Sequence, residues 1–263
     1  TSGGNNNAFG HRALQLNTTG AGNVAFGTYA LLNNSTAANN NAFGYGALQA
    51  NTTGSQNVAI GASALNIATT SQDNIAIGYA AMGQAQSGSS NNAIGSLALY
   101  SNISGGGNNA LGSYALNANT IGNDNTAVGS FAMYLNSTGN QNVALGSSAM
   151  YQVRSATTSV AIGYQSGYGA SGAAYTSNTM VGYKTGVALS TGSNNLLLGY
   201  QAGNELVTGS NNIIIGYDID ATSTDSVGGL NIGNLIYGTG NGTGSTVGTG
   251  NIGIGTTSPG QKL

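Results

Sequence analysis

Asn57-Val58-Ala59-Ile60-Gly61-Ala62-Ser63-Ala64-Leu65 is the stretch that decides the fold. Its core, Asn-x-Ala-h-Gly with a bulky apolar residue at h, returns every 17 residues along the chain. The closing glycines are Gly10, Gly27, Gly44, Gly61, Gly78, Gly95, Gly112, Gly129, Gly146 and Gly163, followed after a two-residue insertion by Gly182, Gly199, Gly216 and Gly233. A fixed period of this kind is the signature of a repeat architecture.

Aligning the repeats gives columns of like residues, each expected to form a ladder along the molecule. We select as structural ladders the Asn, the apolar and the Gly columns, represented by Asn57, Asn74 and Asn91, by Ile60, Ile77 and Ile94, and by Gly61, Gly78 and Gly95. Stacked Asn amides can hydrogen-bond along the axis, and this stacking explains the recurrence of Asn in the column without any catalytic or binding role.

Each repeat holds two short apolar stretches separated by Asn, Ser, Thr and Gly, which favour turns. Such stretches are too short for a pair of helices and fit two strands of a stacked coil. The sequence therefore predicts an all-β protein, a parallel β-solenoid (β-roll or β-helix) of about fourteen 17-residue coils over residues 1–237. At about 4.8 Å per coil the rod would be roughly 65 Å long.

Both faces of the main strand are apolar, because the Ala column and the following Ile, Phe or Leu column are neighbours in sequence. One coil interior cannot bury both faces, which predicts an oligomer, most simply a homotrimer around a common axis. Which of the two columns faces that axis, and the handedness of the solenoid, stay open.

The pattern changes near residues 163–182. The Ala column enlarges to Met180, Leu197 and Ile214, while the Leu or Met column shrinks to Gly167, Gly186 and Gly203. Because cores tolerate coordinated changes that keep the total volume, we expect these two columns to face each other inside a coil.

The segment Asn57–Ser63 resembles the NSVAIG-type repeat of trimeric autotransporter adhesin heads, and the units around Asn40–Gly54 resemble repeats of phage tail fibres and fibre-like bacterial surface proteins. The resemblance covers residues 5 to 237 and implies a trimeric, extracellular fibre on a cell surface or a virion. The end of the chain, 251–263, resembles what precedes the self-cleaving chaperone of tail fibres. Residues 238–263 are thus expected to be a Gly-rich tapering segment that leads toward a C-terminal domain not contained in this sequence.

Composition limits the possible functions. Only 4% of residues are charged, with 4 Lys plus Arg against 6 Asp plus Glu, so nucleic-acid binding is not expected. No apolar run is long enough for a membrane span, and the absence of Cys excludes thiolate metal sites. The lone His11 has no nucleophile and orienting group at a consistent spacing, and the Gly-rich stretch 238–244 lacks the Lys-Ser/Thr of a phosphate loop. We expect no enzyme activity and no cofactor.

Three surface features remain as candidate binding elements. Asp218, Asp220 and Asp225 could be calcium ligands, but the missing Gly bend and terminal Glu favour a solvated loop, and no metal is expected. Paired hydroxyl residues such as Thr52 and Thr53 recur in the turns and raise the possibility of ice binding. Two columns of aromatic residues could stack along the axis: Tyr164, Tyr183, Tyr200 and Tyr217, and separately Tyr134, Tyr151 and Tyr168.

The leading functional prediction is a structural shaft or display segment of an extracellular fibre that mediates attachment, with further copies of the chain as its main partner. The alternatives are a carbohydrate- or surface-binding module that uses the Tyr columns against a cell-surface glycan or protein receptor, and an ice-binding solenoid.

Overall fold

The computed structural model describes residues 3–240 and 250–256. The chain divides into two compact units, residues 1–138 and 139–263, each of which is described by itself. Residues 241–249 and 257–263, which include most of the Gly-rich stretch and the end of the segment expected to taper, lie outside the described residues.

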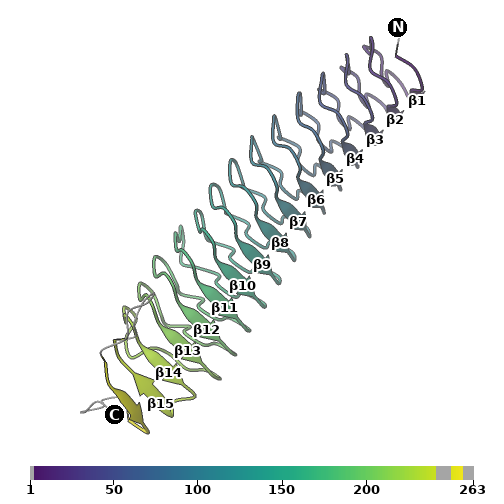
Figure 1. Cartoon of the computed structure of the whole chain (residues 1–263). Helices are drawn as coiled ribbons and strands as arrows, with labels where there is room; N and C mark the ends of the chain where they lie inside the picture. Colours follow the sequence, from purple (N-terminus) through teal and green to yellow (C-terminus); the bar gives the residue numbers. More distant parts are fainter. Residues whose placement is uncertain (1–2, 241–249, 257–263) are drawn as a thin grey trace. The chain divides into compact units, whose positions relative to one another are not determined.

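Unit 1 contains eight three-residue strands, which follow one another in Figure 1, and each of the first seven pairs in parallel with the next one along the chain. Partners lie 17 residues apart, so Ala42 pairs with Ala59 and Ala59 with Ala76. The strands are β1 (Asn7–Phe9), β2 (Val24–Phe26), β3 (Asn41–Phe43), β4 (Val58–Ile60), β5 (Ile75–Ile77), β6 (Asn92–Ile94), β7 (Asn109–Leu111) and β8 (Thr126–Val128).

Unit 2 continues the same pattern and then reverses it. Its strands are β9 (Val143–Leu145), β10 (Val160–Ile162), β11 (Thr179–Val181), β12 (Leu196–Leu198), β13 (Ile213–Ile215), β14 (Leu230–Ile232), β15 (Ile236–Gly238) and β16 (Ile252–Ile254). Strands β9 to β14 pair in parallel, and the step from β10 to β11 takes up the two-residue insertion. Strands β15 and β16 are antiparallel to their neighbours, so part of the segment expected to taper is ordered as sheet.

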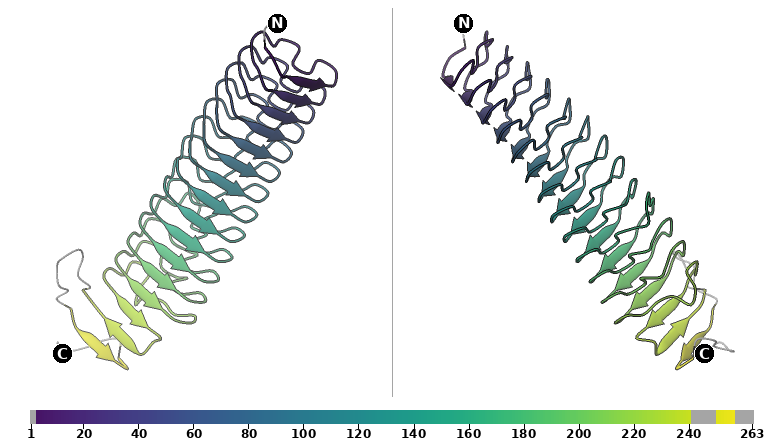
Figure 2. Two further views of the ribbon diagram at one scale, coloured as in Figure 1. Left: turned by 45° about the vertical axis from the view of Figure 1, so that its right-hand side comes forward. Right: turned by 180° about the vertical axis from the view of Figure 1, so that it is seen from behind.

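The predicted fold class is confirmed: the chain is an all-β parallel β-solenoid with about thirteen coils of about 17 residues. In both views of Figure 2 the strands of each unit lie side by side, and the turns close each coil on the other side. Each coil carries one strand, so the prediction of two strands per coil is wrong. The second apolar stretch, for example Ala64 and Leu65, lies in a run of turns.

The backbone geometry of that run explains why it is not a strand. Leu48 and Leu65 have φ angles of 51° and 47°, in the left-handed region that bulky residues seldom adopt. Alternate amides bond within the turn and to the next coil: Gln49 N–H donates to Gly46 O, whereas Leu48 N–H donates to Ala64 O. The bonds between coils hold the unusual conformation in place, as strained residues require.

The Gly that closes each repeat is fixed by its conformation and by its close neighbour. Gly61 has φ of 133°, and an added Cβ would lie 2.7 Å from the carbonyl carbon of Gly78 in the next coil. Any side chain would therefore push the coils apart at this point.

The interior of unit 1 is built from the Ala column and the Leu or Met column. Ala59 and Ala76 are fully buried, as are Leu65 and Met82. The residue after each Ala, such as Ile60, lies on the outer side of the strand and is 40% exposed. The two apolar columns of the strand thus point to opposite sides, and the Ala column is the interior one.

In unit 2 the interior volume is divided differently. An added Cβ at Gly203 would lie 2.9 Å from Leu197 Cδ2, and one at Gly186 would lie 2.9 Å from Leu197 Cδ1. The glycines therefore face the enlarged residues of the former Ala column, which occupy the space that Leu or Met fills in unit 1. Tyr175 is also fully buried, and its hydroxyl donates to Gly167 O at 2.6 Å. Burial raises the pKa of Tyr175, which stays neutral.

Buried Asn side chains connect one coil to the next. In the first Asn column, the backbone N–H and the Nδ2 of Asn74 both donate to Asn57 Oδ1, each at 3.1 Å. Asn74 Nδ2 also donates to Gly88 O at 3.0 Å, and Asn91 repeats this arrangement on Asn74. The amides thereby satisfy backbone groups that would otherwise be buried without partners.

A second, shorter Asn ladder lies seven residues after the Gly column. Asn34 and Asn51 each donate Nδ2 to the preceding Asn Oδ1, at 2.8 and 3.1 Å, but Ala68 and Ala85 occupy the next two coils. The ladder resumes at Asn102. Because of this gap the buried Oδ1 of Asn51 accepts no hydrogen bond.

Filling the gap should stabilise the fold. We expect the double variant Ala68→Asn with Ala85→Asn to raise the free energy of unfolding by about 1–2 kcal/mol, because Asn51 Oδ1 gains a donor and the two ladders join. Ala68→Asn alone only moves the unpaired acceptor by one coil and should gain less. Denaturant unfolding of the three proteins measures the difference, and a double variant less stable than the parent would contradict the expectation.

The packing of unit 2 gives a second prediction. Gly203→Leu should lower the free energy of unfolding by about 1–3 kcal/mol, because the new side chain overlaps Leu197. The backbone itself permits Leu here, since Leu48 has a similar φ in the same column. Leu197→Ala in the Gly203→Leu background restores the combination found in unit 1 and should recover part of the loss. If Gly203→Leu is neutral and Leu197→Ala rescues nothing in thermal unfolding, the two positions do not compete for space.

Candidate interaction surface

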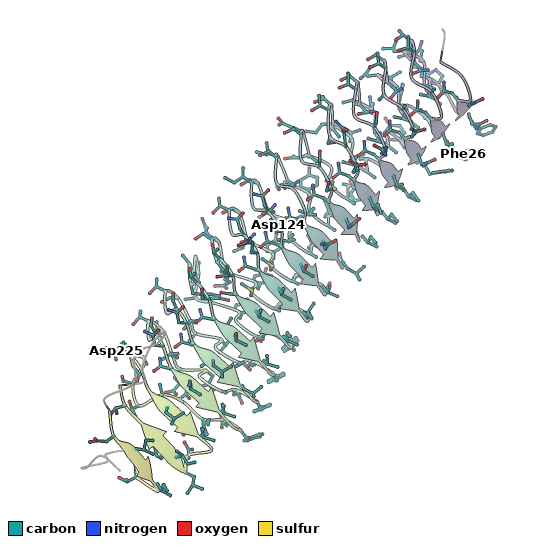
Figure 3. All side chains as sticks on the ribbon, in the orientation of Figure 1. Phe26, Asp124 and Asp225 are labelled. Carbon is teal, nitrogen blue, oxygen red and sulfur yellow. The ribbon has the colours of Figure 1, made fainter. Side chains whose placement is uncertain are left out.

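The outward side of the strands carries a row of exposed apolar side chains in each unit. We call it the strand face and define it by the first and third residues of each strand from β1 to β14, none of which is charged. In unit 1 Phe9 and Phe26 are 68% and 51% exposed, and their rings stack at 4.8 Å. Figure 3 shows Phe26 pointing away from the coil. In unit 2 Leu196 and Leu198 are exposed in the same way.

The strand face has hollows where its outer columns stand above the small Ala column. One hollow of about 220 Å³ is lined by Asn92, Ile94, Asn109, Ala110, Leu111 and Val128. Another of about 230 Å³ is lined by Asn7, Ala8, Phe9, Val24, Ala25 and Phe26. The walls of the first hollow are mainly apolar, whereas polar atoms form a larger share of the walls of the second, and nothing in the sequence repeat indicates either hollow.

Across the strand face, Asn is the main exception to the apolar pattern. Asn92 and Asn109 occupy the first position of β6 and β7, and Asn92 Nδ2 donates to Asn109 Oδ1 at 2.7 Å. The matching positions of β2 and β4 carry Val24 and Val58.

A tyrosine stripe follows the strand face in unit 2. Its four rings, spaced along consecutive coils and nearly parallel, stack at centroid distances of 5.5, 5.1 and 4.7 Å in the order Tyr164, Tyr183, Tyr200 and Tyr217. Lys184 Nζ lies 5.4 Å from the centre of the Tyr183 ring. Since most ring faces contact another ring, the stripe presents mainly ring edges and hydroxyls to its surroundings. Tyr217 is the last ring of the stack and is 73% exposed.

The second predicted tyrosine column falls in both units and has different surroundings in each. In unit 2 Tyr151 stacks on Tyr168 at 5.2 Å. In unit 1 Tyr134 meets Tyr114 and Phe131 edge-on.

The turn hydroxyls that suggested ice binding bond within the chain. Thr18 Oγ1 donates to Ser35 O at 2.7 Å, and Thr52 Oγ1 donates to Thr69 O at 3.0 Å. Ser35 Oγ donates in the same manner to Thr52 O. These hydroxyls therefore extend the ladders between coils, although exposed neighbours such as Thr53 and Thr70 remain at the surface.

The acidic residues of unit 2 do not form a chelating group. Asp220 Oδ1 accepts a hydrogen bond from Glu205 N–H at 2.9 Å, while Asp218 and Asp225 are exposed. Partial burial raises the pKa of Asp220, and the nearby Glu205 and Asp218 raise it further. In the part of the chain that the structure describes, no group of three or more His, Asp or Glu side chains is placed to hold a metal ion. In Figure 3 Asp124 and Asp225 both lie among the turns, away from the strand face.

The lone histidine is part of an aromatic contact. The His11 ring lies edge-on to the Tyr29 ring at 5.7 Å, and the Arg12 guanidinium lies 6.0 Å from the centre of the Tyr29 ring.

Over residues 3–240 and 250–256 no helix is long and apolar enough to cross a membrane.

Comparison with protein-family models, with curated proteins and with solved structures found no match to this chain. The strand face, its Asn residues and the tyrosine stripe therefore have to be interpreted from their own geometry.

Proposed function

We propose that this chain is a structural shaft or display segment of an extracellular fibre and that it assembles as a homotrimer through the strand face. The observation that carries the proposal is the uncharged, largely apolar strand face, which repeats in every coil of each unit.

The size of this face argues for a covered surface. In unit 1 the large apolar residues Phe9, Ile60 and Leu111 are 68%, 40% and 48% exposed on one side of the strands, as part of a row that runs over eight coils. Soluble monomers usually expose contiguous apolar patches of only a few hundred Å². Because the same columns run through all copies, association about an axis along the coils would cover the face over its whole length.

The resemblance of Asn57–Ser63 to adhesin-head repeats supports three copies and an extracellular setting, either on a cell surface or on a virion, as in a bacterial adhesin or a phage tail fibre. The stack of coils suits a spacer, since each coil hydrogen-bonds to and packs on its neighbours alone, and the stack can therefore have any number of coils. The proposed role needs no catalytic group and no cofactor. Its other partner would be a receptor on the target surface.

Charges placed on the strand face test the proposal. Ile77→Asp with Ile94→Asp puts two carboxylates on adjacent coils of the proposed interface, where burial would leave them unpaired. We expect a trimer for the parent protein and dissociation or misfolding for the variant, measured by light scattering coupled to size-exclusion chromatography.

A matched pair of charges on the turn side serves as the control. Thr53 and Thr70 are exposed and also lie on adjacent coils, so Thr53→Asp with Thr70→Asp should leave the trimer intact. A parent protein that is a stable monomer would overturn the proposed assembly outright.

A second candidate function is carbohydrate or surface binding through the tyrosine stripe, favoured by the exposed Tyr217 ring at its end. An aromatic ring with a polar tip suits a contact that is partly wet. On a glycan array the parent should then bind at least one glycan class, and Tyr217→Ala and Tyr183→Ala should each weaken that binding about tenfold or more, as expected for loss of a contact residue at an interface. Tyr151→Ala is the control outside the stripe, and equal loss in all three variants would point to unfolding instead.

A further inference from the structure

The middle section of the outer apolar column in unit 1 contributes little to aligning one copy with another. Ile60, Ile77 and Ile94 follow one another at the same position of successive coils. If a neighbouring copy shifted by one coil, Ile would still meet Ile, and the buried apolar area would hardly change. A surface of this kind specifies its register only weakly.

Asn92 and Asn109 interrupt the run of apolar residues at the first strand position, so a shift by one coil would change which residues they face. They stand on consecutive coils of unit 1, and with Ile94 and Leu111 they line the hollow of about 220 Å³. Ile75 occupies the same column on the preceding coil. A shift by one coil would therefore bring an amide of one copy opposite an isoleucine of the next.

One hydrogen bond joins the two side chains of this pair inside the chain, and it involves one of the two amide nitrogens and one of the two carboxamide oxygens. Asn92 Nδ2 donates to Asn109 Oδ1, whereas Asn92 Oδ1 and Asn109 Nδ2 have no partner among the described residues. One carboxamide oxygen and one amide nitrogen thus remain free in the lining of the hollow, on a face that is largely apolar.

We propose that Asn92 and Asn109 pair with the same two residues of neighbouring copies and thereby set the axial register of the assembly. The inference rests on the proposed function, because it requires that the strand face be the interface between copies. In register, Asn92 lies opposite Asn92 and Asn109 opposite Asn109, and each free Asn109 amide donor has a free Asn92 oxygen of the next copy one coil away, at about 4.8 Å along the axis. Out of register by one coil, Asn92 of one copy is buried against Ile75 of the other without a partner, which is costly. A single polar residue in an apolar coiled-coil seam acts in the same way.

A second copy is the occupant that this surface fits. The strand face carries no charge that would select an acidic or basic partner. Another copy presents an acceptor and a donor at the same spacing, one coil apart, together with apolar side chains of the same columns that can enter the hollow.

The test is whether chains that contain Asn92 and Asn109 and chains that lack both assemble into separate trimers. In the variant Asn92→Val with Asn109→Val, both residues become the valine that the same column has at Val24 and Val58. Equal amounts of this variant and of an affinity-tagged parent are unfolded together, refolded, and examined by native mass spectrometry. We expect mixed trimers to fall about fivefold or more below the random proportion, since each would contain unpaired buried amides.

The control variant is Val58→Ile, which changes the same column without an amide and should mix with the parent at random. Circular dichroism and thermal unfolding of Asn92→Val with Asn109→Val check that the coils themselves still form. Random mixing of the Asn variant with the parent would overturn the inference and leave the proposed trimer standing. A parent chain that is monomeric would instead remove the proposed function, and the inference with it.

Cysteine trapping reads the register directly, because the chain has no native Cys. Chains carrying Ile77→Cys and chains carrying Ile94→Cys are mixed, and disulfides form only between side chains at close range. With Asn92 and Asn109 in place, we expect bonds between like positions only. With both replaced by Val, bonds between positions 77 and 94 should appear, and their presence in the parent background would contradict the inference.

Discussion

The rest of the solenoid depends on the hydrogen bonds of the Asn carboxamide that stands four residues before the Gly in twelve of the fourteen repeats. Its oxygen accepts two bonds from the Asn of the next coil, and its Nδ2 donates to a backbone carbonyl fourteen residues ahead, as Asn74 does to Gly88. The bond to the carbonyl ties the turn of one coil to the strand of another. With these groups satisfied, the short strand and the strained turns can both be buried.

Much of the fold follows from the sequence because the period is strict and strands alternate their faces. The spacing predicts the parallel coils, and the neighbouring Ala59 and Ile60 predict an inner and an outer side. The conformation of Leu65 does not follow, because leucine has no preference for positive φ and the bonds that hold it come from the next coil. Considered without the next coil, Ala64 and Leu65 therefore predict a strand, although the chain forms turns at these residues.

The sequence predicts which residues of the candidate surface lie in the same column, but it does not predict how their side chains contact one another. Repeating positions show which tyrosines lie on consecutive coils, but whether their rings offer faces or edges depends on stacking, as for Tyr183 and Tyr200. The direction of the Thr52 hydroxyl likewise depends on a carbonyl in the next coil. The hollow beside Asn109 arises from side-chain volumes on three coils, and no single repeat contains that information.

The ladder of Asn57, Asn74 and Asn91 has a consequence for how such a protein can change during evolution. Because each coil offers its successor the same acceptor that it uses on its predecessor, a duplicated or deleted coil rejoins the ladder without leaving a broken contact. Unequal recombination between repeats would then lengthen or shorten a stack in steps of about 4.8 Å. The length of the molecule could thus be selected almost independently of its stability.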